Sequence, residues 1–190
     1  MTDLFIYMFI CSFTPGPGNI LALRTVCVYG FKNSFRLILG ICMGYAIVQA
    51  ICTIALYELN SYFESFINII KYIGFAYMLF LSLNILYCSS VDSGSGKKPA
   101  LLIGLVLQLV NIKIYFYIIT LISVYFLPGS DGVSDLIYWG CVAVFVGSVA
   151  CLCWSLFGVS MRNVYNNHCR FINLILALML FYCAVSMLLG

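Results

Sequence analysis

The sequence predicts an all-α integral membrane protein, and three observations support that prediction. Hydrophobic residues make up 64% of the 190 residues, charged residues make up only 8%, and the mean hydropathy is +1.11. A soluble domain is roughly 45–50% apolar and about 25% charged. The apolar residues also form long runs, each close to the roughly 20 residues that a helix needs to cross a hydrocarbon core of about 30 Å.

Six such runs are present, and the connections between them are too short to hold a soluble domain. They lie near residues 4–28, 36–57, 66–88, 101–127, 136–158 and 171–189. The opening Met1-Thr2-Asp3 lacks the basic segment of a secretory signal, so we expect the first run to be a retained span. Residues 1–190 are therefore expected to form one transmembrane transporter-type domain in the lipid bilayer.

The basic residues predict the orientation of these spans. Lys32 and Arg36 follow span 1, Lys97 and Lys98 follow span 3, and Arg162 and Arg170 follow span 5. The connections after spans 2 and 4 hold Glu58, Glu64, Asp131 and Asp135 without Lys or Arg. Because basic loops stay cytoplasmic, both termini are expected on the outer, periplasmic side. The basic residues form no single patch, so the net charge of +3 does not indicate nucleic-acid binding.

The ten cysteines are not arranged as a disulfide scaffold or a metal site. Eight of them lie in apolar spans, no CxxC pair occurs, and the only histidine, His168, lies in a predicted loop. Cysteines in such positions usually pack as small hydrophobic residues. We expect no metal, no cofactor and no enzymatic activity.

An odd number of spans per half has a consequence for the fold. If residues 1–96 and 97–190 each cross the membrane three times, the second half is inserted upside down relative to the first. The prediction is therefore six transmembrane helices arranged as two inverted three-helix repeats. Gly40 and Gly44 form a GxxxG pattern on span 2, for which helix packing is the favoured interpretation.

Spans 1 and 4, which occupy corresponding places in the two halves, are each expected to break near the membrane midplane. The segment 14–19 reads Thr-Pro-Gly-Pro-Gly-Asn, and residues 111–113 read Asn-Ile-Lys. Proline frees backbone groups that lipid cannot satisfy, so a break of this kind must face protein, water or a solute. At 1.5 Å per residue, Pro15 and Lys113 lie about 16 and 18 Å from the ends of their spans.

Lys113 is the most informative single residue. A cation at the centre of a span costs about 2.5–3.5 kcal/mol and usually faces a cavity or a partner. The acidic residues all lie in loops or at span ends, namely Asp3, Glu58, Glu64, Asp92, Asp131 and Asp135. A substrate carboxylate could therefore be the partner. A structural lysine, held by Asn111, Gln108 and carbonyls of the broken helix, is the alternative.

Several of these motifs resemble one family of membrane transporters. They are the run from Thr14 to Leu23, Tyr29-Gly30-Phe31, Gly40 to Gly44, Gln108 to Lys113, Phe126-Leu127-Pro128, Cys153 to Leu156 and Asn173 to Leu178. The pattern resembles the LysE/RhtB amino-acid exporters, in particular the branch that exports cysteine and O-acetylserine. Two departures concern the site, because many relatives have Asn in place of Gly18 and Pro in place of Ile112.

The resemblance implies a bacterial inner-membrane exporter of small neutral amino acids, driven by protons as an antiporter. We expect a zwitterionic amino acid to bind midway through the membrane, its carboxylate near Lys113 and the N–H groups that follow Pro17. The predicted substrate-binding residues are Thr14, Pro15, Gly16, Pro17, Gly18, Asn19, Asn111 and Lys113. A homo-oligomer remains open.

Two other functions compete with export. A six-span thiol-redox carrier would need cysteines on both facing halves, and span 4 has none, whereas span 1 has Cys11 and Cys27. A passive channel or structural bundle would show no saturable, gradient-dependent flux.

Overall fold

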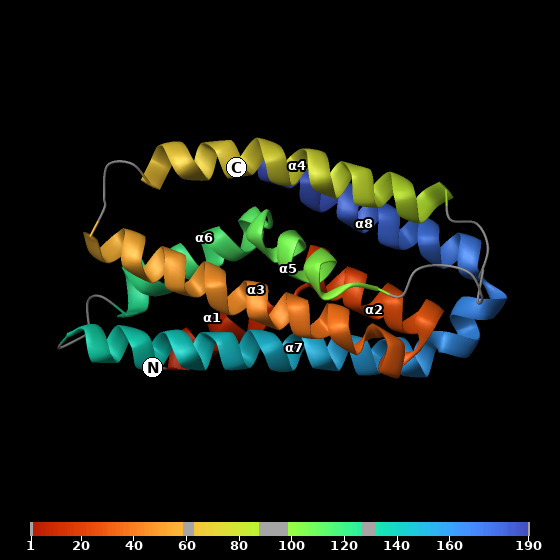
Figure 1. Ribbon diagram of the computed structural model, residues 1–190, viewed down its shortest axis with the longest axis horizontal. Coiled ribbons are helices and arrows are strands. Elements are labelled where there is room, and N and C mark those ends of the chain that lie inside the picture. The colour runs from red at the N-terminus through yellow and green to blue at the C-terminus, as the bar shows by residue number, and fades with distance from the viewer. Residues whose placement is uncertain (1, 59–62, 88–98, 127–131, 190) are drawn as a thin grey trace.

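A computed structural model describes residues 2–58, 63–87, 99–126 and 132–189, and these residues contain helices and no strands. The helices are α1 (Thr2–Phe13), α2 (Pro17–Tyr29), α3 (Phe31–Glu58), α4 (Phe63–Tyr87), α5 (Leu101–Leu109), α6 (Ile112–Thr120), the π-helical η1 (Leu121–Phe126), α7 (Val133–Asn167) and α8 (Cys169–Leu189) (Figure 1). The predicted all-α class is confirmed.

Spans 1 and 4 are each divided in two at the predicted segments. The axes of α1 and α2 differ by 47°, and those of α5 and the continuous α6–η1 segment differ by 57°. Pro17 takes the first position of α2, where a missing N–H costs nothing, and Gly16 precedes it in an extended conformation. Asn111 separates α5 from α6 in the same way, although no proline stands at that break.

The described helices support between two and four membrane crossings. Residues Phe31–Leu56 of α3 and the whole of α7 are each long and apolar enough to span a bilayer, and each bent pair can form one further broken span. Helices α4 and α8 contain the shorter apolar segments Tyr72–Leu86 and Cys169–Val185. The count of six spans therefore remains a prediction.

The cytoplasmic connections that the sequence predicts are shorter in the structure. Helix α7 continues to Asn167, and only His168 separates it from α8, so Arg162 and Arg170 lie on helices and not in a loop. Lys32 and Arg36 likewise belong to the first turns of α3, which follows α2 after Gly30. Polar residues at the end of α7 continue the helix because water can solvate them beyond the apolar layer.

Helices from both halves interleave in the bundle. Helix α3 packs against α5 and α7, α2 packs against α7, and α4 lies beside α8 along one edge (Figure 1). The α3–α5 contact depends on glycine: a Cβ at Gly40 would lie 2.0 Å from the Leu101 carbonyl oxygen, and one at Gly104 would lie 2.3 Å from that of Leu37. Gly44 lies on the same face, where an added Cβ would be 2.7 Å from Cβ of Gln108.

Two apolar clusters fill the bundle, one on each side of the helix breaks. The first gathers residues such as Met8, Val48 and Phe126, and the second gathers Ile20, Leu37 and Leu180. The polar side chains that the breaks carry lie where the two clusters meet.

Candidate functional site

The Lys113 side chain reaches across the bundle to the break in span 1. Its Nζ donates hydrogen bonds to the carbonyl oxygens of Thr14, at 3.0 Å, and Pro15, at 3.4 Å. It passes so close to Gly16 that a Cβ there would lie 3.1 Å from Nζ. The first turn of α6 thus brings a cation directly against the segment that joins α1 to α2.

Three side chains replace the backbone donors that the Pro-Gly-Pro segment removes. Asn19 donates to the carbonyl of Ser12 at 2.9 Å and to that of Thr14 at 3.3 Å. The Trp154 indole N–H donates to the carbonyl of Phe13 at 3.1 Å. Together with Lys113, these side chains satisfy the four carbonyls of residues 12–15, which have no helical N–H partner at the break.

The break in span 4 meets the start of α2. Asn111 Nδ2 donates to Gln108 Oε1 at 3.0 Å, and a Cβ at Gly18 would lie 3.0 Å from the same oxygen. Gly18 therefore leaves room for the Gln108 amide. The other oxygen of this pair, Asn111 Oδ1, is buried and has no hydrogen-bond partner. An orphaned buried acceptor of this kind costs about 1–3 kcal/mol, which a bound donor would recover.

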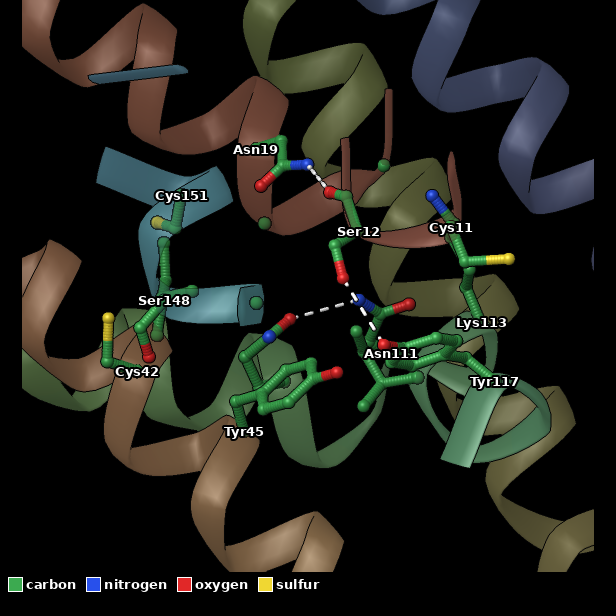
Figure 2. A pocket seen from close by; sticks show the side chains of 16 residues that line it. Cys11, Ser12, Asn19, Cys42, Tyr45, Asn111, Lys113, Tyr117, Ser148 and Cys151 are labelled. Carbon is green, nitrogen blue, oxygen red and sulfur yellow. Dashed lines mark hydrogen bonds between the residues drawn. The ribbon is translucent and has the colours of Figure 1, made fainter. Parts of the chain in front are cut away.

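These polar groups surround a small cavity between α1, α2, α3, α5, α6 and α7 (Figure 2). Its volume is about 40 Å³, enough for a few water molecules but too small for an amino acid. A second cavity of about 330 Å³ lies between α1, the start of α2, α4, α6 and α8. Both cavities are lined by Cys11, Lys113 and Tyr117. Lys113 therefore lies between the two cavities.

The eight predicted site residues all lie where the two helix breaks meet, a region called the junction below. Gly16, Gly18, Asn19, Asn111 and Lys113 line the small cavity, and Pro17 lines the larger one. Thr14 and Pro15 contribute carbonyl oxygens to Lys113, whereas the Thr14 hydroxyl turns back to the Ile10 carbonyl. The structure therefore brings them together, and their role in substrate binding stays a prediction.

Other residues at the junction were not predicted as site residues. They are Ser12, Tyr45, Tyr117, Ser148 and Trp154. A polar group inside an apolar run is a usable signal, because a buried phenol or indole needs a partner. The sequence does not reveal which of the many tyrosines face the breaks, since that depends on how α3 and α7 pack.

Three thiols line the small cavity, and they come from both halves of the chain. Cys11 and Cys42 belong to the first half and Cys151 to the second (Figure 2). The expectation that thiols could not face one another across the halves considered spans 1 and 4 alone. Helices α3 and α7 supply such a pair instead.

The comparison with protein families decides which group the chain belongs to. The model of the LysE type translocator matches residues 9–190, nearly the whole chain. The chain belongs to the LysE family. The residues that form the two breaks and the junction between them all fall inside the matched region.

Individual relatives of this LysE family member carry a more specific name. A cysteine/O-acetylserine efflux protein of Salmonella typhimurium is 33% identical over 180 residues, which cover 94% of this chain and 92% of the relative. A protein of the same name from Escherichia coli O157:H7 is 31% identical over the same shares of the two chains. No solved structure matches this chain significantly.

Proposed function

We propose that this LysE family protein is a secondary active exporter of small neutral amino acids, most specifically cysteine and O-acetylserine, from the cytoplasm to the periplasm. The family and the names of the relatives support this function. The observation that carries it is the Lys113 ammonium beside a cavity, with two backbone carbonyls as hydrogen-bond partners and a third N–H left to donate. A mobile anionic group is the natural complement of that charge.

A zwitterionic amino acid fits the polar groups of the junction. Its carboxylate would accept from the third Lys113 N–H and from the N–H groups at the start of α2, where the helix dipole is positive. Its ammonium would donate to Asn111 Oδ1, which lacks a partner. The carbonyls of Thr14 and Pro15 are not left for the ammonium, because Lys113 itself donates to them.

Transport requires the junction to open, because the cavity is smaller than its substrate. We propose six spans in two inverted halves that rock against each other around the breaks. Part of the packing fits this symmetry, because α3 pairs with its counterpart α7 and α4 with α8. The extensive α2–α7 and α3–α5 contacts have much smaller counterparts in α3–α6 and α1–α7, so the two halves pack differently in this conformation. If Lys113 then gave up its hydrogen bonds to the carbonyls of Thr14 and Pro15, the two cavities would become connected.

Proton coupling is part of the same proposal. The carboxylates of the described residues lie near helix ends, away from the junction, so the proton would travel on Lys113 or on the amine of the substrate.

The inner membrane of a bacterium, with both termini periplasmic, is the proposed location.

Reconstituted vesicles test the function and its energy source together. Labelled cysteine, O-acetylserine, threonine and lysine are offered with and without an imposed pH gradient. We expect saturable flux of cysteine and O-acetylserine that rises with the gradient, and little flux of lysine. Equal, non-saturable flux of all four would favour a passive channel and contradict the proposal.

A further inference from the structure

Tyr45 differs from the other buried tyrosines that line or approach the site. It is 4% exposed and lies on α3 at the small cavity. Its hydroxyl makes no hydrogen bond of good geometry, although the hydroxyls of Tyr117 and Ser12 lie near it. The hydroxyl of Tyr115 donates to the Leu109 carbonyl at 3.0 Å, and that of Tyr165 donates to Asn173 at 2.7 Å. Tyr117 accepts a hydrogen bond from Ser12 at 3.4 Å. A buried phenol normally finds a partner, so an unpaired one at a cavity indicates a ligand.

The Tyr45 ring packs against residues of two other helices. A Cβ at Gly147 of α7 would lie 2.8 Å from Cζ of Tyr45, so the ring rests against a helix surface that only glycine leaves free. The Tyr117 ring of α6 also lies near it, with the two ring centroids 6.3 Å apart. The ring is thus fixed between α6 and α7, and its hydroxyl points toward Asn111 and Tyr117 (Figure 2).

We infer that Tyr45 is a specificity-determining residue, whose hydroxyl binds the polar group on the side chain of the transported amino acid. This inference rests on the proposed function. Lys113 and Asn111 are assigned to the two charged ends that every amino acid shares. The Tyr45 hydroxyl, which has only the nearby hydroxyls of Tyr117 and Ser12 beside it, is left to meet the side chain of the substrate. The substrate class is therefore an amino acid with an oxygen or sulfur atom attached to its β-carbon.

The chemistry of the hydroxyl ranks such substrates. A phenolic O–H donates well to an ester carbonyl and poorly to a thiol sulfur, which is a weak acceptor. A methyl group has no acceptor for a hydrogen bond from the hydroxyl. O-acetylserine should therefore depend on Tyr45 more than cysteine does, and 2-aminobutyrate, which has a methyl in place of the cysteine thiol, should not depend on it.

The test compares two substrates in Tyr45→Phe, a variant that keeps the ring and removes only the hydroxyl. The readout is the ratio of kcat/KM for O-acetylserine to kcat/KM for 2-aminobutyrate in reconstituted vesicles. We expect this ratio to fall about two- to tenfold relative to wild type, the value of one hydrogen bond lost. An unchanged ratio in an active variant would overturn the inference, whether kcat/KM stays the same for both substrates or falls equally for both.

Two further variants separate recognition from structure. Tyr165→Phe removes a buried hydroxyl that bonds Asn173 far from the cavity, and it should leave the ratio unchanged. Gly147→Ala places a methyl against the Tyr45 ring and should lower the ratio in the same direction, which keeps the test valid if Tyr45→Phe fails to fold. Wild-type vesicles without saturable transport of either substrate would contradict the proposed function itself.

Discussion

At the level of single residues, the break in span 1 is stabilised by side chains in place of the helix's own N–H groups. Four consecutive carbonyls are satisfied by Asn19, Trp154 and Lys113. Each donor comes from a different helix, so the local conformation of the Pro-Gly-Pro segment depends on the tertiary fold. A water-filled loop would need no such arrangement.

Asn19→Ala tests this arrangement. The substitution leaves the Ser12 carbonyl without its donor, so we expect the free energy of unfolding to fall by about 1–3 kcal/mol and transport to weaken. Thermal unfolding of the purified protein measures the first effect. Asn33→Ala is the matched control, because its amide bonds the Tyr29 carbonyl at an exposed position and its loss should matter little. Equal effects from the two variants would contradict the role given to Asn19.

The sequence reveals only part of this junction. Lys113 and the 14–19 segment are visible because charge and proline are rare inside a span. The sequence does not single out Trp154, Tyr45 and Ser148, because their roles depend on which face of α3 or α7 meets the breaks. A helix that is apolar all round has no distinct apolar face from which that direction could be predicted.

At the level of helices, close packing of α3 on α5 fixes the position of the second break. Gly40 and Gly104 let the two backbones approach so closely that a methyl group on either would meet a carbonyl oxygen. In a membrane, such small-residue contacts provide much of the attraction between helices. The sequence predicts that Gly40 and Gly44 serve packing, but it does not identify α5 as the partner.

Gly40→Ala is expected to displace α5 and to reduce stability by about 1–3 kcal/mol, with a loss of transport because Gln108 and Asn111 move with that helix. The unfolding midpoint and the initial rate of O-acetylserine flux measure the two effects. Gly132→Ala serves as the control, because an added Cβ there meets nothing within 4 Å. A Gly40→Ala protein as stable and active as wild type would show that the α3–α5 contact is looser than described.

The boundaries of the helices show where sequence patterns are weakest. Hydropathy locates the apolar runs but not the ends of α7, which extends beyond its run at both ends as one 35-residue helix. The backbone hydrogen bonds of the helix do not require apolar side chains, so the helix extends past the apolar run and hydropathy does not mark its ends. The π-helical η1 after α6 also leaves no mark in the sequence.

At the level of the whole molecule, the arrangement of charges supports the proposed orientation. The basic residues at the start of α3 lie at the same end of the bundle as those near the α7–α8 junction, and Gly30 lies beside the Arg162 guanidinium. The start of α1 and the end of α8 lie toward the opposite end (Figure 1).

Reporter fusions test this orientation. A reporter that is active only in the cytoplasm should be inactive at both termini and active when inserted between residues 90 and 98. The expectation follows from the positive-inside rule. Activity at either terminus would reverse or break the proposed topology.

A cysteine-free variant tests whether transport or thiol chemistry is the function. Three thiols line the small cavity, but the proposed binding groups are Lys113, Asn111 and Tyr45, none of which is a thiol. Replacing every cysteine by alanine or serine should preserve saturable O-acetylserine transport within a few-fold of wild type. Loss of flux on replacing Cys42 and Cys151 alone, in a folded protein, would favour the thiol-redox alternative.

Lys113 and the break in span 1 together form the proposed amino-acid site. Equilibrium binding of labelled O-acetylserine to purified protein tests it most directly, with Lys113→Met compared with wild type and with the exposed-residue control Lys32→Met. A charge-assisted hydrogen bond contributes about 1.5–3 kcal/mol, so affinity should fall at least tenfold in Lys113→Met and stay unchanged in Lys32→Met. A folded Lys113→Met protein that binds O-acetylserine as tightly as wild type would show that the amino-acid site lies elsewhere.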